Sequence, residues 1–218
     1  MPGNESNARL DVLNSIRTAL GSSQDPARIA QDYAAIPRDY KRTGTLSREE
    51  IVKLFEHRLR EYGAGVYHAS TDGISGKLAS ILNDRACKRI VVPAGLENRW
   101  LPEGFDFNEG THLDNYELDQ VDGVLTVCTV AIAETGSVVL QNAPGQGPRI
   151  LSLIPDYHLC IVFAEQVVET VPEGFASLEA NSCLPTTFVS GPSATADIEM
   201  TRIKGVHGPR FLDALLVQ

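Results

Sequence analysis

The chain has 218 residues, of which 43% are hydrophobic and 22% are charged, and its formal net charge is -9 at pH 7. This acidic balance opposes binding to nucleic acid and to anionic membranes, because the phosphates of both are repelled overall. Apolar runs stay far below the roughly 20 residues that span a bilayer and no signal peptide begins the chain, so the sequence predicts a cytoplasmic protein with no membrane span and no nucleic-acid partner.

The first 45 residues are predicted to form a helical arm ahead of the main domain. Residues 8–20 carry apolar side chains at helical spacing, and Gly21 follows as a stop signal. Residues 22–45 are polar and interrupted by Pro26, Pro37 and Gly44, which favours an extended connector. We expect the helix of this arm to pack on a partner subunit, as in a homo-oligomer, or on the flank of the main domain.

A single α/β domain is predicted over residues 46–218. Its first helix begins after Ser47, because Ser47 and Glu50 form the S-x-x-E pattern of a capping box, and Gly63 ends it. A strand at 64–68, a helix at 75–85 and a β-branched strand at 89–93 follow. This alternation is typical of βαβ units with a parallel sheet, in which strands covered on both faces are continuously apolar.

The second half of the domain is rich in strands. Strands are predicted at residues 124–130, 137–140, 159–163, 186–189 and 211–217, and a helix at 172–180. The whole chain should hold roughly seven to nine strands and four to six helices. The sequence therefore predicts an α/β fold with an open, mostly parallel or mixed sheet, helices on both faces and an N-terminal helical arm.

Three loops in the last third of the chain carry the side chains with the clearest chemistry. In the loop at 190–199, a serine cap would leave N–H groups free to bind a carboxylate or a phosphate. Its candidate ligand-binding residues are Ser190, Gly191, Ser193 and Thr195, and Asp197 is a candidate for accepting a proton. The alternative is a capped turn without a ligand, because S-G-P-S-x-T matches neither the Walker nor the Rossmann pattern.

The other two loops add a histidine, an arginine and a glutamate. At 205–210, His207 is a candidate proton carrier and Arg210, after Gly208, a candidate fork for an anion; the alternative for His207 is a purely structural role. At 131–137, Glu134 is a candidate nucleophile or base, or a hydrogen-bonded turn residue. Its neighbours Thr135, Gly136 and Ser137 are candidate ligand-binding residues.

A fourth loop, at 143–149, is flexible by composition. Its Arg149 would either close over an anionic ligand or lie at a solvated hairpin tip.

Cysteine and histidine spacing argues against a metal site. The four cysteines lie far apart, and two of them are inside apolar runs, which predicts buried reduced thiols and no intrinsic iron–sulfur cluster. The five histidines form no H-x-x-x-H pair. These residues are Cys87, Cys128, Cys160 and Cys183, and His57, His68, His112, His158 and His207.

Four segments, taken in this order and spacing, resemble the lactate utilization protein C (LUD domain) family. They are A-I-A-E-T-G-S at 131–137, S-L-I-P-D-Y-H at 152–158, S-G-P-S-A-T-A-D-I-E at 190–199 and G-V-H-G-P-R at 205–210. The resemblance covers about residues 47–217. Ser137 stands where threonine is usual in the family, and Ala194 where arginine is common, so one anion contact is missing here.

The resemblance implies a fold similar to the sugar-phosphate isomerases and CoA transferases, with ligand loops at strand ends. It also implies a role beside two iron–sulfur partner proteins that oxidise L-lactate to pyruvate, with the clusters held by the partners and no cofactor in this chain. The family's motif positions fall on Glu134, Thr135, Gly136, Ser190, Gly191, Pro192, Ser193, Thr195, Asp197, Gly205, His207, Gly208, Pro209 and Arg210.

Three functional hypotheses follow. The first is an accessory subunit of a lactate-oxidising complex, whose three loops converge on a small anionic metabolite or on a partner's surface. The second is a free-standing enzyme acting on a phosphorylated or CoA-linked metabolite, with Glu134 as nucleophile, as in CoA transferases of similar fold. The third is a structural dimerisation module.

Overall fold

The computed structural model describes residues 5–20, 25–110, 113–196, 202–204 and 208–218. By its internal contacts the chain divides into an N-terminal unit, Met1–Tyr40, and a larger unit, Lys41–Gln218. Within the described ranges, no helix is both long enough and apolar enough to cross a membrane.

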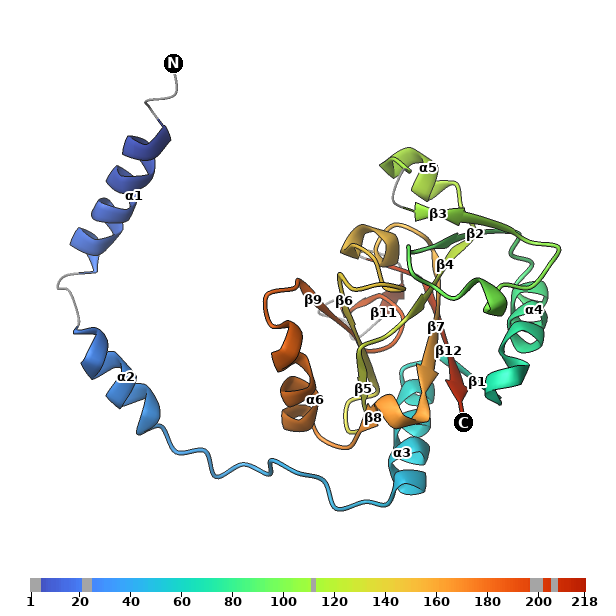
Figure 1. Ribbon diagram of the computed structural model, residues 1–218, viewed down its shortest axis with the longest axis horizontal. Helices are drawn as coiled ribbons and strands as arrows, with labels where there is room; N and C mark the ends of the chain where they lie inside the picture. Colours follow the sequence, from blue (N-terminus) through green and yellow to red (C-terminus); the bar gives the residue numbers. More distant parts are fainter. Residues whose placement is uncertain (1–4, 21–24, 111–112, 197–201, 205–207) are drawn as a thin grey trace. The chain divides into compact units, whose positions relative to one another are not determined.

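Two helices form the N-terminal unit, α1 at Glu5–Ala19 and α2 at Pro26–Ala34 (Figure 1). The helix α1 agrees with the helix predicted at 8–20, but α2 replaces part of the predicted extended connector. Proline at the first helical position loses no hydrogen bond and has a suitable φ, so Pro26 begins a helix instead of preventing one. Asp25 caps it, because its Oδ1 accepts a hydrogen bond from the Ala27 N–H at 3.0 Å.

The larger unit is built on a six-stranded parallel sheet with the order β1-β12-β7-β4-β2-β3 (Figure 1). Its strands are β1, Gly65–Ala69; β2, Arg89–Val92; β3, Asp106–Glu109; β4, Gly123–Val127; β7, Tyr157–Phe163; and β12, Phe211–Val217. The central strands β7 and β12 are almost wholly buried, as expected for strands covered on both faces. The predicted α/β class with a mostly parallel sheet is confirmed.

Alternate residues of β7 divide the core into two layers. Cys160 and Val162 join the cluster that includes α3, Arg48–Glu61, whereas Leu159 and Ile161 join the cluster that includes α4, Ile74–Asp84. Helices therefore cover both faces of the sheet. The predicted capping box at the start of α3 is present, since the Ser47 N–H donates to Glu50 Oε2 at 2.8 Å.

A second, four-stranded sheet packs on the same face as α3 and has the order β8-β5-β6-β9. Its strands are β5, Val130–Ile132; β6, Ser137–Gln141; β8, Val167–Val168; and β9, Thr186–Val189. The helix α6, Val171–Leu178, covers the opposite face of this sheet, where Leu178 packs on Val130, Ile132 and Val139. β9 is left at the edge of the sheet, paired only with β6 among the described strands.

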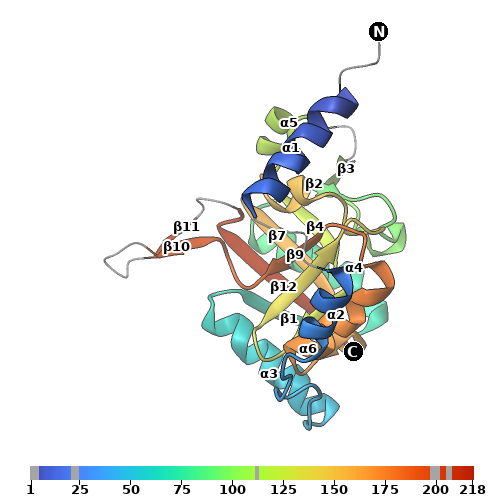
Figure 2. The ribbon, with the colours of Figure 1, turned by 90° about the vertical axis from the view of Figure 1, so that its left-hand side faces the viewer.

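The structure adds short elements that the sequence patterns do not predict. They are α5, Asn115–Asp119, several strands of two to four residues, and the hairpin of β10, Ala194–Ala196, and β11, Arg202–Lys204. Figure 2 shows this hairpin standing away from the two larger sheets. The described residues hold twelve strands, more than predicted, because strands this short display no readable alternation.

Candidate functional site

The carboxyl edge of the parallel sheet, where open α/β sheets commonly bind ligands, is covered at the ends of β7 and β4. Trp100 is buried there and packs against Phe163 at the end of β7, with ring centroids 5.7 Å apart. At the end of β4, the Val127 N–H donates to Gly145 O at 2.9 Å. Residues of the predicted loops gather instead beside the second sheet.

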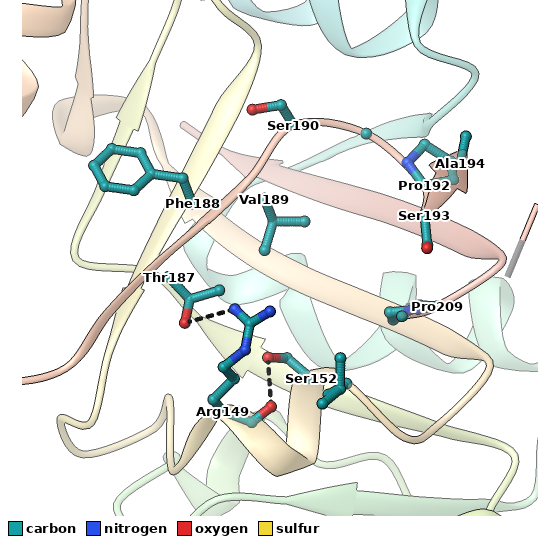
Figure 3. Close-up of a pocket in the computed structure, with 13 residues that line it drawn as sticks. Arg149, Ser152, Thr187, Phe188, Val189, Ser190, Pro192, Ser193, Ala194 and Pro209 are labelled. Carbon is teal, nitrogen blue, oxygen red and sulfur yellow. Dashed lines mark hydrogen bonds between the residues drawn. The ribbon is translucent and has the colours of Figure 1, made fainter. Parts of the chain in front are cut away.

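A cavity of about 300 Å³ lies beside β9 (Figure 3). Its walls are β9 and the loop after it, the short helix η4 at Arg149–Ser152, and residues 208–209. Four of the predicted ligand-binding residues line it, namely Ser190, Gly191, Ser193 and Gly208. The structure thus brings two of the three predicted loops to one cavity.

Backbone geometry fixes the loop that follows β9. Gly191 has φ +87°, and a Cβ at this position would lie 2.5 Å from Tyr62 Cβ, so a larger residue would not fit. The Ser193 N–H donates to Pro209 O at 2.8 Å, which ties this loop to the segment before β12.

The third predicted loop is linked to the cavity through side-chain hydroxyls. Thr135 Oγ1 is 2.7 Å from Ser137 Oγ, and Ser137 Oγ is 2.5 Å from Ser190 Oγ. Ser137 is buried, whereas Ser190 belongs to the cavity lining. These hydrogen bonds hold the 133–136 turn against the end of β9.

Gly136 allows this turn to lie directly on α3. Its φ is +57°, and a Cβ there would lie 2.7 Å from Arg58 Cβ and 3.1 Å from Leu59 N. We expect Gly136→Ala to lower the free energy of unfolding by about 2–4 kcal/mol, because left-handed strain adds to overlap with the helix. Urea denaturation followed by circular dichroism measures the change.

Gly63→Ala is the matched control for this substitution. Gly63 has φ +83° but no heavy atom within 4 Å of a built Cβ, so only the left-handed strain of about 1–2 kcal/mol applies. Equal losses for the two variants would contradict a tight contact between the turn and α3.

Glu134 lies in an acidic cluster outside the cavity lining. Lys41 Nζ is 3.9 Å from Glu134 Oε1 and donates to Glu169 Oε1 at 2.5 Å. The Glu169 carboxylate, only 4% exposed, also accepts hydrogen bonds from the N–H groups of Thr45 and Leu46 at 2.6 and 2.7 Å. The Lys41 hydrogen bond, followed by these backbone donors, holds the pKa of Glu169 below its ordinary value.

The charge balance around Glu134 has a chemical consequence. Lys41 lies beside the carboxylates of Glu134 and Glu169 and also interacts electrostatically with that of Glu173. Of these four groups, one is a cation and three are carboxylates, a balance that attracts cationic groups and disfavours a further anion beside Glu134.

The remaining predicted site residues are distributed as follows. Arg210 Nε donates to Asp156 Oδ1 at 2.9 Å, and Arg210 Nη2 donates to the other oxygen, in a pair that is about half exposed. Thr195 belongs to β10. Asp197 and His207 lie outside the described residues.

Two residues gain importance from the structure. Arg149 lines the cavity from η4, instead of occupying a hairpin tip, and its Nη1 donates to Thr187 Oγ1 at 3.4 Å (Figure 3). The sequence patterns do not single out Lys41, because its closest partner, Glu169, is 128 residues away along the chain.

The cysteines are all free thiols, three of them buried: Cys87, Cys128 and Cys160, with Cys183 exposed. Burial raises the pKa of the Cys87 thiol to about 11, so its reactive thiolate is scarce at neutral pH. In the part of the chain that the structure describes, no group of three or more His, Cys, Asp or Glu side chains is placed to hold a metal ion.

Comparison with known proteins gives one consistent result. A sequence model of the LUD domain matches residues 52–217. The chain is 41% identical over 213 residues to "Lactate utilization protein C" of Deinococcus radiodurans, covering 96% of this chain and 95% of that one. It is 26% identical to the Bacillus subtilis protein of the same name, with 90% of each chain covered.

A solved structure is also similar to this chain. The crystal structure of a DUF162 family protein from Deinococcus radiodurans matches with a TM-score of 0.70 and 39% identity, covering 80% of this chain and 100% of that one. This similarity supports the α/β fold described above.

Proposed function

The chain belongs to the LUD domain family, and on this premise we propose that it is a cytoplasmic lactate utilization component that acts with iron–sulfur partner proteins in oxidising L-lactate to pyruvate. The observation that carries the proposal is the 41% identity, over nearly the full length of both chains, to a protein named for lactate utilization. In this role the chain needs no cofactor of its own, because the partners supply the electron carriers.

We propose further that a small anionic metabolite binds in the cavity beside β9. Arg149 supports this, because a guanidinium group offers a planar fork that matches a carboxylate. In the described part of the chain Arg149 forms no ion pair, and its hydrogen bond to Thr187 is long. Ser193 adds a hydroxyl group to the cavity lining. Gly191 and Gly208 have no side chains, so a ligand can contact their main-chain atoms directly.

Reconstitution with the purified iron–sulfur partner proteins tests this function. Pyruvate formation from L-lactate should require the chain, and Arg149→Met should weaken binding of the anion about 10- to 100-fold, the loss expected for one charged hydrogen bond. Arg99→Met is the control, because Arg99 is exposed, pairs with Glu97 and lies outside the cavity lining. Unchanged lactate oxidation when the chain is omitted, with no binding to the partners, would contradict the proposal.

A second candidate function is a free-standing enzyme that uses Glu134 as nucleophile on a phosphorylated or CoA-linked metabolite. Its support is the accessibility of Glu134, whose side chain is 41% exposed beside Lys41. The surrounding carboxylates count against it, since they repel an anionic substrate. Assayed alone with a CoA thioester and a free carboxylate, the chain should show turnover that Glu134→Gln abolishes if Glu134 is the nucleophile. In the lactate assay, the same variant should leave pyruvate formation unchanged if the first function holds.

A further inference from the structure

The cavity beside β9 is lined by residues from both faces of that strand. Thr187, Phe188 and Val189 of β9 all belong to its lining, although neighbouring residues of a strand point to opposite faces. Val189 packs against the inner core and Phe188 packs against Phe175 of α6, with ring centroids 5.4 Å apart. Because residues of both faces line it, the cavity meets the main chain of β9 along the edge that is unpaired among the described strands.

The edge of β9 carries hydrogen-bonding groups that β6 does not use. In an antiparallel pair, every second residue of an edge strand directs its N–H and C=O groups away from the partner strand. The sequence of β9, T-T-F-V, contains no lysine or proline, which are the residues that commonly protect such an edge. Figure 3 shows the Arg149 side chain extending toward Thr187 on this strand.

We propose that this edge binds the C-terminal segment of a partner polypeptide by strand addition, with the partner's terminal carboxylate paired to Arg149. The inference rests on the proposed function and deepens it, because the partner's terminal carboxylate and the small anionic metabolite would occupy the same Arg149 subsite, one at a time. Strand addition supplies main-chain hydrogen bonds from β9, and Arg149 supplies the charge that a carboxylate needs.

The charge of the cavity favours a chain end over a strand that runs through. Along a polypeptide main chain, only the C-terminal end carries the carboxylate that would pair with Arg149. In antiparallel pairing, the carboxyl end of the added segment lies beside the first half of β9. Thr187 and the Arg149 guanidinium are in that half.

A peptide of simple sequence tests the proposal with the full-length chain. The probe is fluorescein-labelled Thr-Val-Thr-Val-Thr-Val with a free C-terminal carboxylate, compared with its C-terminal amide and with a form N-methylated at alternate residues. Fluorescence polarisation should show saturable binding of the free acid with a dissociation constant below about 1 mM. The amide and the N-methylated form should each bind at least about 10-fold more weakly. These changes are made in the ligand, so they leave the fold of the protein intact.

Amide hydrogen exchange gives a second readout that a small anion does not produce. Bound peptide should slow exchange at alternate residues of β9, whereas L-lactate should slow none of them in this pattern. Arg149→Met should weaken the free acid about 10-fold or more and leave the amide unchanged, with Arg99→Met as control.

Each outcome has one meaning. No saturable binding, or equal binding of the three peptides, overturns strand addition. If L-lactate binds and the peptide does not, the cavity takes only a small anion, and the proposed function stands without this inference. If the peptide binds as described while lactate oxidation is independent of the chain, strand addition stands and the proposed function fails.

Discussion

Arg85→Met should lower the free energy of unfolding by about 3–5 kcal/mol, a large part of the roughly 5–15 kcal/mol that stabilises a typical domain. Arg85 forms a bidentate ion pair with Asp213, in which Nε donates to Oδ2 at 3.0 Å and Nη2 donates to Oδ1 at 2.7 Å. The Asp213 side chain is fully buried in β12 and accepts one further hydrogen bond, at 2.8 Å, from the Tyr157 hydroxyl. Removing the guanidinium leaves a buried carboxylate without a counter-charge.

Two further variants separate this ion pair from general packing. Arg85→Met combined with Asp213→Leu removes both charges, so it should recover much of the loss. Arg210→Met breaks a similar two-armed pair with Asp156, but that pair is about half exposed, and its loss should cost only about 0–1 kcal/mol. Urea denaturation of the three variants measures these differences, and similar losses for Arg85→Met and Arg210→Met would contradict the role of burial.

Acid should destabilise the protein through His158 between pH 6.5 and pH 4. The ring is fully buried, its Nε2 is 2.8 Å from Thr126 Oγ1, and its Nδ1 has no hydrogen-bond partner within the described structure. Burial lowers the pKa of His158 from 6.5 to about 4. The unfolded chain therefore binds this proton at a higher pH than the folded chain, and the folded state loses stability as the pH falls through that window.

The size of the effect follows from the shift. Because the folded chain disfavours the protonated ring, the free energy of unfolding should be about 3 kcal/mol lower at pH 4 than above pH 6.5. His158→Gln keeps a polar group near Thr126 but does not titrate. The difference in unfolding free energy between wild type and His158→Gln should therefore shift by about 3 kcal/mol from pH 7 to pH 4. A difference that stays constant over this range would contradict a neutral buried His158.

Local sequence signals located most of the regular elements. The capping box at Ser47, the stop at Gly63 and the apolar run Phe211–Val217 predict the ends of α3 and the extent of β12. Each of these signals acts within a few residues, through a cap, a left-handed glycine or an alternation. Pro26 was the exception, since proline both interrupts helices and begins them, and only the surrounding chain decides between the two.

The sequence predicted which residues are candidates for the site but not how they are arranged in space. The loop residues Ser190, Gly191, Ser193 and Gly208 stand out in the sequence, and all four line one cavity. Glu134 stands out equally, yet it lies with Lys41 and Glu169 outside that lining. The sequence around these residues does not show which of them line the cavity and which lie outside it, because that depends on which strand edges the fold brings together.

By itself, the sequence determined the α/β class, the main helices and strands, and the family, because these rest on short-range periodicity and on motifs with fixed spacing. Only the tertiary structure decided which partners meet: Arg85 with Asp213 and Lys41 with Glu169, each pair 128 residues apart. It also placed Arg149 beside the edge of β9 that is unpaired among the described strands. Such long-range pairings depend on the order of strands in the sheets, which local pattern does not encode.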